Sequence, residues 1–160
     1  MGFFNKIKNT FNQMTGSTGN IQLRINKAQY ARGESIDVAF TLYATGALKG
    51  KSVNIELVAT ERIKFQVPVQ NTSSSSNSSW TRTEERTQEH QTYRHVEMLD
   101  AAGIQLNEGE SREYTGTLRV PEVTQATYQG VNAQHTWQVR AFVDVPMGGD
   151  IDAETDIAVL

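Results

Sequence analysis

Residues 136–145, with the sequence TWQVRAFVDV, decide the fold class of this chain. Apolar side chains occupy every second position of the stretch: Trp137, Val139, Ala141, Val143 and Val145. Strict alternation of this kind is typical of a β-strand that turns one face to a core and the other to water. Because Trp137 lies in the middle of the run, we expect it to anchor the core.

The same two-residue period recurs along the chain, in segments 21–25, 36–43, 53–67, 114–120 and 151–159. Residues 84–99 are more polar, and we expect an edge strand or the arm of a hairpin there. One-sided sheets bury their apolar faces by packing against each other. The sequence therefore predicts an all-β fold, an antiparallel β-sandwich of about seven strands with an immunoglobulin-like arrangement.

Two segments depart from this period. Residues 3–14 carry apolar side chains at helical spacing and predict a short amphipathic helix. A tract rich in Ser and Asn predicts a mobile hairpin tip at 70–83. The predicted organisation is a helix and linker at 1–19, followed by a single sandwich domain at 20–160.

Composition narrows the function classes. A length of 160 residues suits one domain, and the absence of Cys excludes disulfides and thiolate metal sites. The net charge of −3 is too mild for a nucleic-acid-binding protein, which needs many basic phosphate contacts. The chain has no apolar run long enough for a membrane span and no secretory signal at its start. We therefore expect a cytoplasmic protein.

A series of turn and strand motifs follows a recognisable order. It comprises YARGESI at 30–36, LKGKSVNIELVATE at 48–61, PEVT at 121–124 with Gly130, and TWQVRAFV at 136–143. In this order and spacing the motifs resemble the first domain of the arrestin-like superfamily, over residues 20–160. The start at Phe3 and Phe4 is similar to the bacterial sporulation-control branch. The resemblance implies an arrestin-like sandwich that acts as a non-enzymatic adaptor or scaffold. Arrestins carry two tandem sandwiches, so functions that need the second one are not implied.

Catalytic and metal sites are not expected. His90 and His95 are five residues apart, which places them on opposite faces of a regular strand and prevents them from sharing a metal ion. His135 stands alone. The abundant Ser residues fall in the mobile tract, where no rigid neighbours could orient a nucleophile. We therefore expect no enzyme activity, no cofactor and no metal.

Two groups of residues are candidate contact sites. The first is the amphipathic face of the predicted helix, formed by Phe3, Phe4, Lys6, Ile7, Lys8 and Phe11. It could cover the protein's own sandwich or a second copy, enter an anionic lipid surface, or bind a groove of a partner protein. The second is an acidic strip made of Asp150, Asp152, Glu154 and Asp156. It could be a solvated strand face, a docking strip for a basic partner, or a Ca²⁺ site, although a straight strand spreads its carboxylates along a line.

Three functions remain open at this stage. The first is an arrestin-like module that binds protein partners, with the inner membrane face as a candidate location. The second is a structural subunit that self-assembles into a larger complex. The third is an enzyme or small-ligand carrier, which would require a deep pocket with convergent polar groups. Partners are expected among proteins, anionic membranes or further copies of the chain, and not among nucleic acids.

Overall fold

A computed structural model describes residues 18–71 and 80–160. The predicted helix at 3–14 and most of the predicted hairpin tip lie outside these residues. All the regular elements described are β-strands. Seven of them have seven or more residues, as the alternation predicts: β1 (Gly19–Ile25), β3 (Ser35–Ala44), β5 (Ser52–Asn71), β6 (Trp80–Asp100), β8 (Ser111–Arg119), β10 (Ala133–Asp144) and β11 (Ile151–Val159).

Four short strands complete the set: β2 (Gln29–Tyr30), β4 (Leu48–Gly50), β7 (Ile104–Leu106) and β9 (Tyr128–Gln129). The strands form a three-stranded sheet in the order β1-β3-β8 and a larger sheet in the order β2-β11-β10-β5-β6. Strand β9 pairs with β10, and β4 pairs with β7 in a separate ribbon. Neighbouring strands are antiparallel except β2 and β11.

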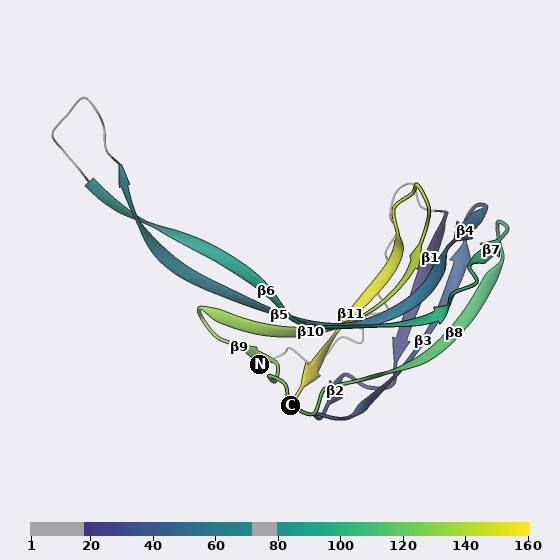
Figure 1. Ribbon diagram of the computed structural model, residues 1–160, viewed down its shortest axis with the longest axis horizontal. Coiled ribbons are helices and arrows are strands. Elements are labelled where there is room, and N and C mark those ends of the chain that lie inside the picture. The colour runs from purple at the N-terminus through teal and green to yellow at the C-terminus, as the bar shows by residue number, and fades with distance from the viewer. Residues whose placement is uncertain (1–17, 72–79) are drawn as a thin grey trace.

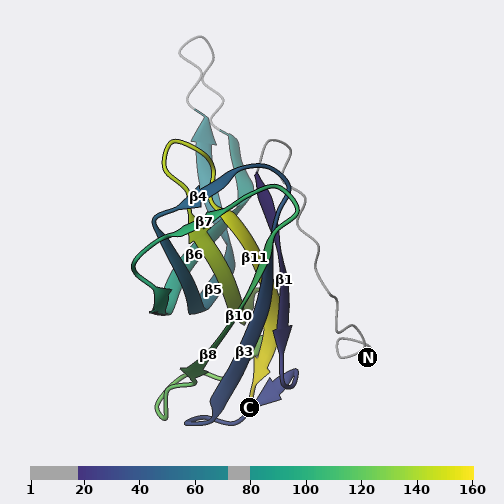
Figure 2. The ribbon, with the colours of Figure 1, turned by 90° about the vertical axis from the view of Figure 1, so that its right-hand side faces the viewer.

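The two sheets pack face to face as a β-sandwich (Figures 1 and 2). Their inner faces supply the core predicted from the alternation, with Trp137 fully buried in β10. The Trp137 ring lies 5.6 Å from the Tyr93 ring of β6, and its Nε1 donates a hydrogen bond to the Gln125 carbonyl at 3.1 Å. A buried indole needs such a partner for its N–H group. Trp137 thus joins β10, β6 and the segment before β9.

The turn between β6 and β7 depends on a glycine. Gly103 has a φ of +85°, which side-chain-bearing residues rarely adopt. A Cβ atom at this position would lie 2.8 Å from the carbonyl oxygen of Gly50. The close approach of these two backbones positions β7 beside β4.

The β5–β6 hairpin is longer than the sandwich that supports it. Strand β10 pairs with β5 only between Ser52 and Ile63, whereas β6 accompanies β5 as far as Asn71. Beyond Ile63 the hairpin projects from the sandwich as a twisted two-stranded ribbon (Figure 1). We call residues 63–71 and 80–88 the arm.

Candidate partner-binding surface

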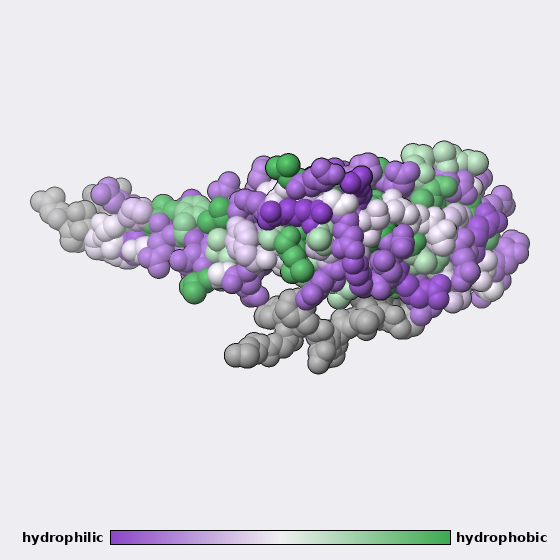
Figure 3. Space-filling model, turned by 90° about the horizontal axis from the view of Figure 1, so that it is seen from below, coloured by the Kyte–Doolittle hydropathy of each residue, from purple (hydrophilic) through white to green (hydrophobic). Residues whose placement is uncertain are grey.

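The arm carries an uncovered apolar row. On β5, Ile63, Phe65, Val67 and Val69 continue the phase of the core residues Leu57 and Ala59. Within residues 18–71 and 80–160 no strand packs against this face. Ile63 and Phe65 are 40% and 41% exposed, and Val67 and Val69 are half-buried. Figure 3 shows hydrophobic residues interspersed with hydrophilic ones along the projecting arm. The alternation predicted the direction of these side chains, but it did not predict that the opposing sheet ends before reaching them.

A row of polar side chains lies beside the apolar row. The pairing places Gln88 opposite Ile63, Arg86 opposite Phe65, Glu84 opposite Val67 and Arg82 opposite Val69. Arg82 and Glu84 contact each other along β6. The same face of the arm therefore presents apolar groups on one strand and alternating charges on the other.

Strand β6 is the edge of the larger sheet, as its polar composition predicted. Among the described residues, no strand pairs with its outer side over its 21 residues. An unpaired edge exposes backbone N–H and C=O groups that can pair with another extended chain. The inner side is interrupted at Thr92, because Tyr93 pairs with Ala59 while Gln91 pairs with Thr60.

This bulge corrects the expectation for the two histidines of β6. His95 pairs with Leu57 and His90 pairs with Glu61. Leu57 and Glu61 are four residues apart on a regular strand and share one face, so the two histidines share a face as well. The extra residue in β6 shifts the alternation by one position. Across 18–71 and 80–160, no cluster of three or more His, Asp or Glu side chains is suited to hold a metal ion.

The third histidine lies in the base of the arm. His135 is fully buried, with Nδ1 3.1 Å from the Ala126 carbonyl and Nε2 2.8 Å from the Thr92 hydroxyl. Because a carbonyl only accepts, Nδ1 carries a hydrogen and donates it to Ala126, while Nε2 is hydrogen-bonded to the Thr92 hydroxyl. The ring of Tyr128 stacks on His135, and the Tyr128 hydroxyl donates to Glu61 at 2.6 Å. This hydrogen bond raises the pKa of Tyr128. These contacts fix the bulge against β10.

A ladder of charges crosses the outer face of the larger sheet. The Glu56 carboxylate is buried and accepts from Arg94 Nε at 2.9 Å and from Arg140 Nη1 at 3.0 Å. Arg140 Nε donates to Asp152 at 2.9 Å. Burial by itself would lower the pKa of Arg140, but the hydrogen bonds to Glu56 and Asp152 outweigh it and raise the pKa. We call Asp152, Arg140, Glu56 and Arg94 the charge ladder. Sequence reasoning missed it, because only the strand register brings these four residues together.

The ladder bears on the predicted acidic strip. Asp152, Glu154 and Asp156 share the outer face of β11, while Asp150 precedes the strand. Asp152 is neutralised by Arg140, and Asp156 accepts a hydrogen bond from Gln138 at 3.0 Å. Glu154 and Asp150 are exposed. Two of the four acids are therefore already engaged within their own sheet.

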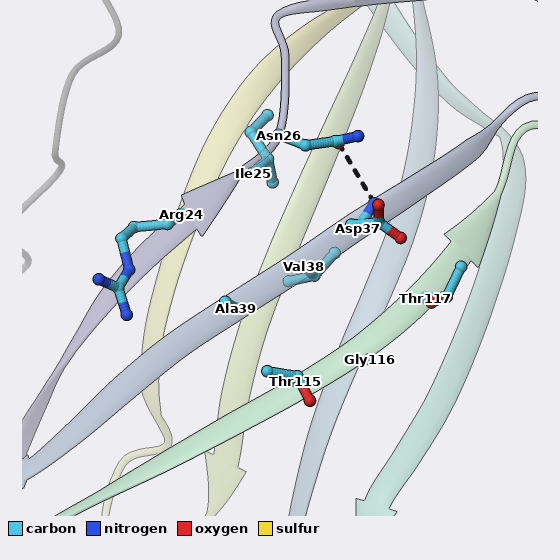
Figure 4. A pocket seen from close by; sticks show the side chains of 9 residues that line it. All are labelled: Arg24, Ile25, Asn26, Asp37, Val38, Ala39, Thr115, Gly116 and Thr117. Atoms are coloured by element: carbon cyan, nitrogen blue, oxygen red, sulfur yellow. Dashed lines mark hydrogen bonds between the residues drawn. The ribbon is translucent and has the colours of Figure 1, made fainter.

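A cavity of about 480 Å³ lies over the three-stranded sheet (Figure 4). Its polar lining comes from Arg24 and Asn26 around β1, Asp37 of β3, and Thr115 and Thr117 of β8. Asn26 accepts a hydrogen bond from the Asp37 backbone at 3.2 Å. Arg24 pairs with Glu113 at 3.4 Å in an exposed setting. Asp37 and Thr117 are cross-strand partners, and the polar side chains of the lining are exposed, so the cavity is a surface groove.

The other predicted contact site falls outside the described residues. It consists of Phe3, Phe4, Lys6, Ile7, Lys8 and Phe11. Over residues 18–71 and 80–160, no helix has the length and apolar character needed to cross a bilayer.

Comparisons with known proteins agree on one fold. The profile of the family described as arrestin (or S-antigen), C-terminal domain, matches residues 17–160. The crystal structure of Spo0M, a sporulation control protein from Bacillus subtilis, superposes with a TM-score of 0.61 at 16% identity. The alignment covers 89% of this chain and 49% of Spo0M, so the chain spans about half the length of that protein. No curated protein sequence matches significantly. The predicted resemblance is confirmed at the level of the family, and the matching profile is that of the second arrestin domain.

Proposed function

Since the chain belongs to the arrestin family, as the match over residues 17–160 establishes, we propose that it is a non-enzymatic module that binds protein partners. We place the binding site on the free edge of β6, where an extended segment of the partner adds to the sheet as a further strand. The observation that carries the proposal is the length of this edge, 21 residues without a neighbour on its outer side in the described chain. Strand addition takes its affinity from main-chain hydrogen bonds.

The composition of β6 favours pairing with one kind of extended segment over pairing with any exposed strand. The strand carries five acidic residues and three arginines. Its two large aromatic residues are Trp80 and Tyr93. Charges on an edge discourage association between flat apolar strands. The excess of acidic groups on β6 favours an extended segment that is basic.

A crosslinking experiment tests the proposal. A photoreactive phenylalanine analogue replaces Met98, which lies on β6 and is 57% exposed. The captured partner is identified, and its affinity for the unmodified chain is then measured by fluorescence anisotropy. We expect bound partner to slow hydrogen exchange of the β6 amides.

Two adjacent proline variants provide the control. Backbone N–H groups of an edge strand point alternately inward and outward, so Glu89→Pro and His90→Pro remove one donor of each kind. The variant that keeps the wild-type melting temperature has lost the outward donor. We expect this variant to bind the partner at least tenfold more weakly. Unchanged affinity in the thermally stable variant contradicts strand addition.

We also propose that the N-terminal residues contribute a second contact, at the surface of an anionic membrane. The support is the spacing of Phe3, Phe4, Ile7 and Phe11 together with two lysines and the absence of acidic residues before Glu34. The full chain should sediment with vesicles that contain phosphatidylserine at low salt, and Phe3→Asp/Phe4→Asp should abolish sedimentation. Equal sedimentation of both proteins would refute this part of the proposal.

A further inference from the structure

No described segment packs against the apolar row of the arm. An isolated two-stranded hairpin is at best marginally stable in water. In the part of the chain that the structure describes, no third strand pairs with the arm beyond Ile63. The one backbone bond to a neighbouring segment runs from the Lys64 N–H to the Asn132 carbonyl at 2.7 Å. Phe65 and Ile63 remain about two-fifths exposed. A packing partner for this face would stabilise the arm.

We propose that the apolar face of the arm is a homodimer contact, in which two arms pack face to face and antiparallel. The two-fold axis lies in the plane of the interface, runs perpendicular to the strands and is level with the Gln66–Glu85 pair. The side chains of this pair point to the opposite face of the arm, because they alternate with Phe65 and Val67. The surface is a face of the arm and not the edge of β6, so this inference and the proposed function can fail independently.

This axis makes the arm complementary to itself. The register places Phe65 against Val67 of the second copy and Ile63 against Val69 of the second copy. On the neighbouring strands it places Glu84 against Arg86 of the second copy, and the reverse. Arg82 then lies opposite the neutral Gln88. A two-fold interface requires each patch to complement itself in this way.

Other placements of the axis fail on charge or on packing. Moving it by one residue pair places either Glu84 or Arg86 opposite its own copy. Moving it by two pairs in one direction places Val67 opposite Glu61, and in the other direction it places Phe65 beyond Val69, the last member of the apolar row. An axis parallel to the strands sets the apolar row against the charged row. The observed pattern thus selects one arrangement of a second copy, and a lipid surface would have to receive Glu84 along with the apolar row.

The contact is small, which sets the expected affinity. Seven residues of each strand span roughly 23 Å, and two strands are about 10 Å wide. Stable interfaces usually bury about 800 Å² on each partner, considerably more than this face offers. We therefore expect reversible dimers that form as the protein concentration rises from micromolar to millimolar.

Charge reversal provides the decisive experiment, with the full chain in analytical ultracentrifugation. Glu84→Arg sets arginines at positions 84 and 86 against each other in the homodimer, and Arg86→Glu does the same with glutamates. Each variant alone should dimerise at least tenfold more weakly than the wild type. An equimolar mixture should recover wild-type association as a heterodimer, because both charge pairs are then restored.

The matched control is Glu85→Arg, which reverses a charge on the same strand but on the opposite face. It should leave dimerisation unchanged. Circular dichroism checks that the variants melt at the wild-type temperature. The inference is overturned by a wild type that stays monomeric up to millimolar concentration, by a mixture that does not recover association, or by Glu85→Arg weakening it as strongly as Glu84→Arg.

Discussion

The buried carboxylate of Glu56 should be the most sensitive charged group of this protein, and Glu56→Gln tests it. The side chain is only 4% exposed and accepts one hydrogen bond from each of two arginines. The glutamine amide keeps a single acceptor oxygen and turns an N–H₂ group toward the other guanidinium, where two donors then meet. One charge-assisted hydrogen bond is lost and a donor is left without its acceptor.

The magnitude follows from what each arginine retains. Arg140 keeps Asp152 at 2.9 Å, so it is not left as an unpaired charge. Arg94 is 51% exposed and can be solvated by water. The full 3–5 kcal/mol known for breaking a buried ion pair is therefore too high. We expect a loss of about 2 kcal/mol, near the value of one hydrogen bond to a charged group. Asp152→Asn should cost about 1 kcal/mol, because Asp152 is more exposed and Arg140 keeps Glu56.

Urea unfolding measures both values. The fluorescence of buried Trp137 reports the transition, and Trp80→Phe removes the signal of the exposed indole. The slope of the free energy of unfolding against urea concentration should be the same as for the wild type, because the substitutions do not change the surface area that unfolding exposes. A loss below 0.5 kcal/mol for Glu56→Gln, measured in the Trp80→Phe background, would show that desolvation cancels the favourable interactions of the ladder and would refute this reasoning.

Three further outcomes are expected. Trp137→Ala should cost about 3–5 kcal/mol, as for other emptied aromatic sites, and an unchanged melting temperature would contradict its role in the core. Gly103→Ala should destabilise the protein more than Gly109→Ala, because both have positive φ but only the Cβ at 103 meets backbone, the Gly50 carbonyl at 2.8 Å; equal melting temperatures would exclude that clash. Burial raises the pKa of Tyr30 above its ordinary value of 10.0, so its contribution to stability is complete below pH 10 and is lost as pH rises through the folded-state pKa. Tyr30→Phe should flatten the decline of the melting temperature above pH 10, and an identical alkaline decline in both proteins would assign it to other groups.

The sequence alone determined the fold class, because the two-residue period is a local property that each strand carries by itself. Trp137 could be assigned to the core from its place in one alternating run, and the polar composition of β6 was sufficient to put that strand at an edge. The family resemblance rested on turn and strand motifs of the same local kind, and the match over residues 17–160 confirmed it.

Strand register and the extent of the opposing sheet were decided only by the tertiary structure. The bulge at Thr92 puts His90 and His95 on the same face, where opposite faces were expected. One additional residue shifts the alternation, and the composition of the strand does not indicate where such a residue lies. The ladder around Glu56 required four strands to align side by side. Ile63 and Phe65 alternate as core residues do, yet they are exposed, because the facing sheet ends before it reaches them. Local periodicity determines the direction in which a side chain points, whereas only the assembled sheets determine whether another strand packs against it.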